Sequence, residues 1–142
     1  MKCLTVQQPY AWAIMLGEKP IENRSQAWKY RGPLAIHAGL TYSQAGCNEI
    51  VSIMGFSLGK PGAERGEISC GALGAILGVV DLVDIHEGWD GCCAPWGHRG
   101  SRAHLELANP RPLPEPMPCR GQLGLWTPPA PILAALTEEV AQ

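Results

Sequence analysis

The longest apolar run in the sequence, residues 72–85, constrains the fold more than any other feature. Most of its members are β-branched or aliphatic: Ile76, Leu77, Val79, Val80, Leu82, Val83 and Ile85. Such side chains are enriched in strands, and glycine inside a strand marks a bend or a bulge. Because Gly74 and Gly78 interrupt the run, it predicts one long, bent, central strand instead of a helix. A small β-barrel needs a strand of this kind where it turns a corner.

Shorter periodic segments lie on both sides of this strand. Further strands are expected at residues 3–6, 21–24, 34–38, 103–109 and 122–126. Helices are expected after Pro9, over 42–54 behind a capping box of Thr41 and Gln44, and over 131–140. Residues 58–70 and 87–102 are predicted loops, and the proline-rich stretch 110–118 is predicted to be extended. At 142 residues the chain is expected to form one α+β domain, residues 1–142, with a barrel of five to six strands and flanking helices.

Charge is unevenly distributed along the chain. The formal net charge of −2 argues against a strongly basic protein that binds nucleic acid without specificity. Four cations nevertheless fall within thirteen residues against the single acid Glu22; they are Lys19, Arg24, Lys29 and Arg31. A local basic face on a mildly acidic protein can still attract phosphate.

The stretch from Gly17 to Arg24 concentrates charge where a helix gives way to a strand. Alternate side chains of a strand share a face, so Glu22 and Arg24 are expected to point the same way and Asn23 the other. Lys19, on the preceding turn, can lean over that face. Two interpretations remain open: an exposed loop with a surface ion pair, or the charged floor of a binding pocket.

The six cysteines do not form a C-x-x-C pair. No apolar run is long enough to span a membrane, and the start of the chain lacks the apolar core of a signal peptide. We therefore expect a cytoplasmic protein with reduced thiols and without a cofactor. Cys92-Cys93 followed by His98 could supply half of a metal site, but adjacent cysteines rarely chelate one ion well, and the expectation is that no metal is bound.

Six short motifs, in order, make the chain similar to the ASCH (activating signal cointegrator homology) family of the PUA-like superfamily. They are Gln8-Pro9-Tyr10-Ala11, Gly17-x-Lys19-x-x-Glu22-x-Arg24, Arg31-Gly32-Pro33-Leu34, Ile36-His37-Ala38, residues 78–84 of the long strand, and Pro118-Cys119-Arg120-Gly121 with Leu125-Trp126. The family often carries Trp where this chain has Gln26, after Ser25. The resemblance implies a PUA-like β-barrel with a cleft lined by the Lys/Glu/Arg signature, and nucleic acid as the partner.

The first functional hypothesis is therefore a module that binds RNA or DNA, with a single strand or a nucleotide-like molecule as the ligand. Lys19, Arg24 and Arg31 offer positive charge to phosphate. Glu22 fits an exocyclic amine of a base, or holds Arg24 in position. The remaining candidates would read or stack bases: Gln8, Trp12, Tyr30 and His37, with Trp28 as a further stacking candidate. For each tryptophan and for His37, a structural role in the core or in a strand is the alternative.

Two other classes of function remain open. The first is a hydrolase, with Lys19 and Glu22 as the catalytic residues. A ribonuclease would use Glu22 or His37 as the base; an amidohydrolase acting on acetylcytidine is implied by the resemblance to small bacterial relatives, whose threonine nucleophile is replaced here by Glu22. The second is a protein-interaction module that docks a partner on 110–118 and on exposed tryptophans, Trp89 and Trp96.

Overall fold

A six-stranded curled sheet forms the body of the molecule in the computed structural model, which describes residues 1–55, 71–89, 91–98 and 100–142. The strands are β1 (Lys2–Gln8), β2 (Ile21–Arg24), β3 (Gly32–Tyr42), β4 (Ala75–Glu87), β5 (Ala103–Pro118) and β6 (Leu125–Trp126). The helices are α1 (Tyr10–Met15), α2 (Gln44–Met54) and α3 (Ala130–Ala141). The predicted α+β class and the strand number are confirmed, while the predicted loop 58–70 lies outside the described residues.

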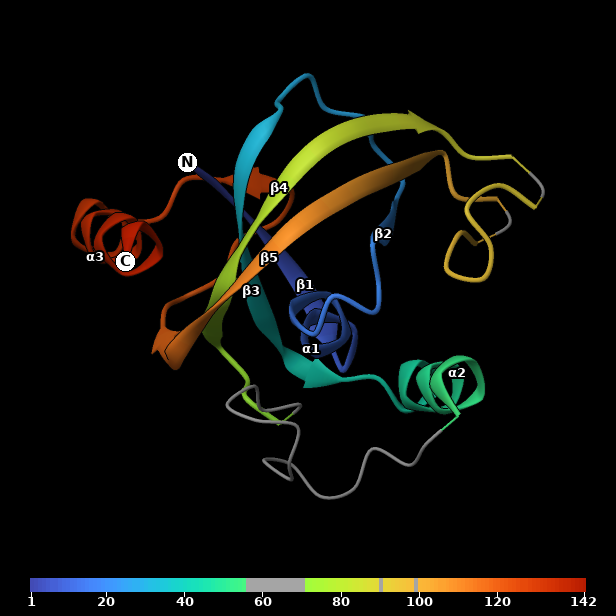
Figure 1. Ribbon diagram of the computed structural model, residues 1–142, viewed down its shortest axis with the longest axis horizontal. Coiled ribbons are helices and arrows are strands. Elements are labelled where there is room, and N and C mark those ends of the chain that lie inside the picture. Colours follow the sequence, from blue (N-terminus) through green and yellow to red (C-terminus); the bar gives the residue numbers. More distant parts are fainter. Residues whose placement is uncertain (56–70, 90, 99) are drawn as a thin grey trace.

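Among the described residues, the strand order is β2-β5-β4-β3-β1-β6, and only the β1–β3 pairing is parallel. The sheet curls into a half-barrel around α1, which lies on its concave side, whereas α3 lies on the outer side (Figure 1). Strands β2 and β6 form the two edges among the described residues. The half-barrel therefore has an open side, and the candidate functional site described below lies there.

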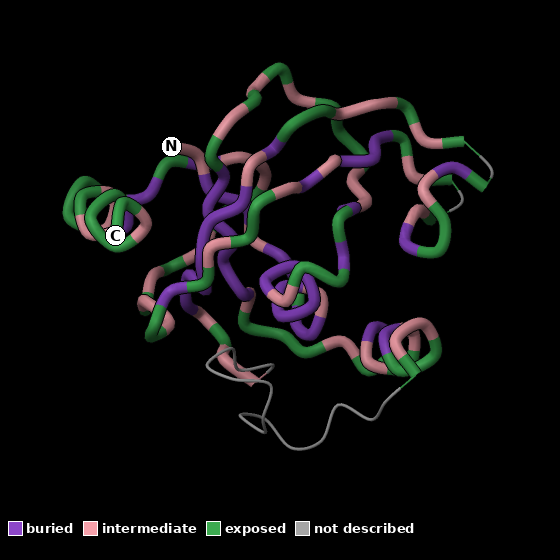
Figure 2. The backbone as a smooth tube through the Cα atoms, viewed as in Figure 1, coloured by how far each residue is buried: buried purple, intermediate pink, exposed green. Residues whose placement is uncertain are grey.

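Alternation along the central strands explains why both faces of the sheet are buried. On β1, Leu4 and Val6 belong to the core around α1, while Cys3 next to Leu4 belongs to the core under α3. On β3, Leu34 and Ile36 face inward and Ala35 outward in the same way. Most of the buried residues lie on α1 and the middle strands, and others lie on α2 and in the loop after β4 (Figure 2).

The predicted bend in the long strand occurs at Gly78. The register of β4 with both of its neighbours shifts next to this residue. A Cβ here would lie 2.5 Å from the carbonyl oxygen of Arg111 and 2.6 Å from Sδ of Met15. Only glycine leaves room for the neighbouring strand and for α1 at this point, so the residue both bends β4 and seats the helix.

One sequence prediction of local structure was wrong. The cap of α2 is Ser43, whose Oγ accepts a hydrogen bond from the Gly46 N–H (2.9 Å), and not Thr41. The proline-rich stretch is extended, as predicted, and it belongs to β5, which continues through it to Pro118 and pairs with β4. Strand β2 covers only residues 103–106 of β5. In the described part of the chain, the prolines therefore lie where β5 has a strand partner on one side only, and there a missing N–H costs little.

Candidate nucleotide pocket

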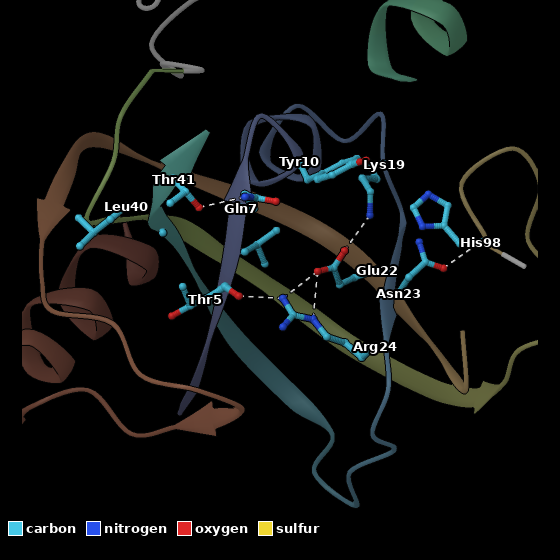
Figure 3. Close-up of a pocket in the computed structure, with 12 residues that line it drawn as sticks. Thr5, Gln7, Tyr10, Lys19, Glu22, Asn23, Arg24, Leu40, Thr41 and His98 are labelled. Carbon is cyan, nitrogen blue, oxygen red and sulfur yellow. Dashed lines mark hydrogen bonds and ion pairs between the residues drawn. The ribbon is translucent and has the colours of Figure 1, made fainter. Parts of the chain in front are cut away.

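A polar pocket occupies the open side of the half-barrel. It has a volume of about 420 Å³. Its walls come from β1, the start of α1, the Lys19 turn, β2, the end of β3 and the loop before β5 (Figure 3). The lining residues are Thr5, Val6, Gln7, Tyr10, Lys19, Glu22, Asn23, Arg24, Gly39, Leu40, Thr41 and His98.

Three charged side chains form a chain of ion pairs at this pocket. Nζ of Lys19 lies 2.9 Å from Oε1 of Glu22, and Nη2 of Arg24 lies 2.8 Å from Oε2 of Glu22. The Nε of Arg24 donates a further bond to Oε2 (3.1 Å). Lys19 is 1% exposed and Glu22 is 7% exposed, so the surface ion pair that the sequence left open is not what the chain forms.

Arg24 also ties together two strands that share no backbone ladder. Its Nη2 donates a hydrogen bond to the carbonyl oxygen of Thr5 (2.7 Å), which belongs to β1. In the strand order, β5, β4 and β3 lie between β2 and β1. The guanidinium therefore bridges the open side of the half-barrel with a side chain, and the pocket lies beside this bridge (Figure 3).

The charged ammonium of Lys19 is surrounded by polar and aromatic groups of the protein. Its ammonium donates to the backbone carbonyl of Ile21 and lies 5.3 Å from the ring centre of Tyr10 and 5.9 Å from that of Trp96. Cation–π contacts of this kind contribute most where the cation has lost its water. The phenol of Tyr10 is itself fixed by a hydrogen bond to Glu49 (2.5 Å).

The carboxylate of Glu22 is kept ionised by its two partners. Burial alone would raise its pKa, but the charges of Lys19 and Arg24 and their hydrogen bonds outweigh burial, and the net effect lowers the pKa below the ordinary value of 4.5. Both oxygens already accept hydrogen bonds. A carboxylate in this state is a weak base and suits the positioning of cations better than proton transfer.

The family model of the ASCH domain matches residues 4–117 of the chain. The chain belongs to the ASCH domain family. Members of this family are generally thought to bind RNA. No curated protein matches the chain. Within the described residues of this ASCH domain, no helix is both long and apolar enough to cross a membrane.

Asn23 anchors the loop that forms one wall of the ASCH pocket. As the alternation predicts, its bonds lead away from the ion pairs: Nδ2 donates to the carbonyl of Trp96 (2.9 Å), and Oδ1 accepts from the N–H of His98 (2.8 Å). The imidazole of His98 then lies 2.7 Å from Oε1 of Glu49 on α2. His98 is therefore a pocket residue, and not a partner of Cys92-Cys93 as the sequence suggested.

Two of the predicted binding residues lie in the interior. Gln8 is fully buried; its Oε1 accepts the N–H of Trp12 (2.9 Å), and its Nε2 donates to the carbonyl of Ala72 (3.0 Å). Trp12 is 3% exposed and packs with Ile50 and Trp96. Both residues support α1 and neither lines the pocket.

Three further candidates lie away from the ion pairs. Arg31 is exposed and pairs with Asp84 (3.4 Å), and the Tyr30 hydroxyl donates to the carbonyl of Pro33. His37 is buried, with its ring nitrogens close to Thr5 Oγ1 (3.2 Å) and to the carbonyl oxygen of Cys119 (2.6 Å). Of the predicted binding residues, the structure brings Lys19, Glu22 and Arg24 together in this pocket.

His37 lines a second cavity of about 580 Å³ next to the first. Thr5, Gly39 and Leu40 line both cavities. Leu40 is 80% exposed at their junction. The remaining pocket residues, such as Gln7 and Thr41, are brought together only by the β1–β3 pairing, so no local sequence signal marks them.

Proposed function

We propose that this ASCH domain binds single-stranded RNA or DNA and holds one nucleotide in the pocket beside Arg24. One observation carries the proposal: a chain of ion pairs, in which Lys19 and Glu22 are buried and Arg24 is partly exposed, faces a cavity of about 420 Å³. Pockets for small ligands span about 300–1,000 Å³, and one nucleotide belongs to this class. RNA is the preferred partner because the family is generally thought to bind it.

The charges favour a ligand site over a purely structural role. Burying ions costs several kcal/mol each, and well-packed apolar residues often stabilise a core at least as well. The three side chains sum to one positive charge at the pocket, which suits a phosphate. Between described residues, the hydrogen bonds of Arg24 use Nε and Nη2, so Nη1 is the donor left for a ligand.

The surroundings of the pocket suit a nucleotide that is linked to a second nucleotide in a strand. Gln7 and Thr41, hydrogen-bonded to each other (2.9 Å), offer an amide and a hydroxyl at the rim for a base edge. Beyond Leu40 the second cavity begins, with Arg120 and the 98% exposed Leu123 on its wall. A strand that crosses Leu40 would place one nucleotide in each cavity, with apolar surface against the bases.

The alternatives are supported less well. A hydrolase needs a base or a nucleophile, and Glu22 is ionised and bonded at both oxygens. A docking surface on two tryptophans is not formed, because Trp96 is 5% exposed while Trp89 is 67% exposed. Binding of cellular RNA is proposed to take place in the cytoplasm, which is also where thiols stay reduced.

The test compares two variants in which an arginine that pairs with a carboxylate is replaced. Arg24→Gln removes the cation of the pocket. The control, Arg111→Gln, removes a similarly exposed arginine on β5 that pairs with Asp81 at the same 2.8 Å but lies outside the pocket. Fluorescence anisotropy with labelled single-stranded RNA and DNA should show affinity that falls with salt. A charge-assisted bond contributes about 1.5–3 kcal/mol, so Arg24→Gln should weaken binding about tenfold or more.

The control variant should bind as the wild type does. Equal affinity of the Arg24→Gln and wild-type proteins, or equal losses in both variants, would overturn the proposal. Turnover is measured in parallel with labelled RNA and acetylcytidine, and product formed by the wild type but not by Glu22→Gln would favour the hydrolase instead.

A further inference from the structure

A second cluster of chemically active side chains lies outside the pocket, where β4 ends and β5 begins. The register of these strands places His86 directly opposite His104, and their rings stand 5.4 Å apart at 82°. The loop after β4 adds two thiols: Cys92 Sγ lies 3.0 Å and Cys93 Sγ 3.2 Å from His86 Nε2. The two sulfurs are 3.4 Å apart.

We propose that His86, Cys92, Cys93 and His104 form a structural zinc site. One ligand atom from each residue lies within 4.8 Å of all the others. With Zn–N of about 2.0–2.1 Å and Zn–S of about 2.3 Å, a tetrahedral ion separates its ligands by about 3.3–3.8 Å. The distances from His86 Nε2 to the two sulfurs, 3.0 and 3.2 Å, need to grow by only a few tenths of an ångström to meet this range, and the 3.4 Å between the sulfurs already lies within it.

The outer contacts of the two histidines fit metal ligands. A ligating histidine usually offers its other nitrogen to a carboxylate or a backbone carbonyl. His86 Nδ1 lies 3.3 Å from Glu106 Oε2, and His104 Nε2 lies 3.4 Å from the carbonyl oxygen of His98. The Nδ1 of His104, a fully buried residue, has no hydrogen-bond partner among the described residues. A buried polar atom left unpaired is costly, and a metal bond would satisfy it.

The backbone explains how adjacent cysteines can serve one ion. Cys93 has a φ of 60°, in the left-handed region that residues other than glycine seldom adopt. This turn brings the two sulfurs to the same side. A Cβ at Gly97 would lie 2.1 Å from the Cys92 carbonyl oxygen and 2.8 Å from His104 Cε1, so the loop closes tightly over the cluster.

The donor set selects the metal. Two thiolates and two imidazoles in a tetrahedral arrangement are typical of zinc, whereas calcium and magnesium prefer oxygen. All four positions are filled by the protein, which is the pattern of a structural site. The ion would fix the loop between β4 and β5 (Figure 1), which also supplies His98 to the pocket and the Trp96 carbonyl to Asn23.

The metal content of the full chain tests the site. Protein without a histidine tag, made in zinc-supplemented medium and passed through a chelator, is analysed by inductively coupled plasma mass spectrometry. We expect one zinc ion per chain in the wild type and in the Cys47→Ser variant, whose thiol lies on α2 outside the cluster. The Cys92→Ser/Cys93→Ser variant should lose the metal, while His98→Ala should keep it.

Cobalt provides a readout that needs no variant to fold. Wild-type protein loaded with Co²⁺ should show the intense visible bands of a tetrahedral ion and a near-ultraviolet thiolate charge-transfer band. A weak octahedral spectrum, zinc-free wild-type protein, or equal zinc in the double-serine variant would each overturn the site.

Discussion

Replacement of Glu22 tests how the buried charges depend on one another. Glu22→Gln leaves the Lys19 ammonium, 1% exposed, without its carboxylate. Loss of one partner from a buried pair costs about 3–5 kcal/mol, because the remaining charge is uncompensated. For a chain of this size each kcal/mol shifts the Tm by about 2–4 °C, so the variant should melt about 10 °C lower.

The double variant Lys19→Met/Glu22→Gln should be more stable than Glu22→Gln alone. Methionine keeps an unbranched stem between the rings of Tyr10 and Trp96 and removes the charge. The partly exposed Arg24 can then turn to water. We expect the double variant to lie within about 2 kcal/mol of the wild type, since apolar replacements of buried pairs are often close to neutral.

Urea unfolding followed by circular dichroism measures the four free energies of this cycle, and slopes that agree between the proteins ensure comparable transitions. If the loss of unfolding free energy in the double variant equals the sum of the losses in Lys19→Met and Glu22→Gln, the two charges do not compensate each other, and the electrostatic reasoning fails.

Two further predictions concern pH and the helix cap. The pKa of Glu22 is lower in the folded than in the unfolded state, so its ion pairs stabilise the protein fully above the unfolded-state pKa, and this stabilisation is lost as pH falls through the folded-state pKa. The difference in unfolding free energy between wild type and Glu22→Gln should therefore become smaller from pH 7 to pH 3. A difference that stays constant over this range would contradict the assignment. Ser43→Ala should cost about 1 kcal/mol by removing the α2 cap, whereas Ser43→Asn should restore most of it in the same urea assay; equal losses in both would mean that the cap does not act through its side-chain oxygen.

Features that depend on residues near one another in sequence could be predicted. The alternation of Glu22, Asn23 and Arg24 indicated which side chains would meet, and the structure pairs the first with the third while the second binds the loop. Gly78 marked the bend of the central strand for the same reason, since a glycine inside an apolar run weakens a strand unless the backbone bends or another segment approaches closely there. The prediction of Thr41 as the helix cap was wrong because Ser43, two residues later, also offers a side-chain hydroxyl that can accept the hydrogen bond.

Features that depend on strand register could not be predicted. Thr5 reaches Arg24 only because β1 and β2 face each other across the open side of the half-barrel. His86 and His104 are eighteen positions apart in sequence, and nothing local reveals that β4 and β5 place them opposite each other. Proximity in sequence instead pointed to His98 as the partner of Cys92-Cys93, whereas its bond to Asn23 holds that residue at the pocket.

The loop between β4 and β5 connects the two sites physically. On one side His98 lines the pocket, and the N–H of His98 and the carbonyl of Trp96 are bonded to Asn23 of β2. On the other side Cys92 and Cys93 meet the histidines of β4 and β5. Because β2 carries Glu22 and Arg24 and, among the strands that the structure describes, pairs only with β5, the position of the ion pairs depends on this loop as well as on the sheet. An ion that fixes the loop would therefore hold the pocket wall without touching a ligand.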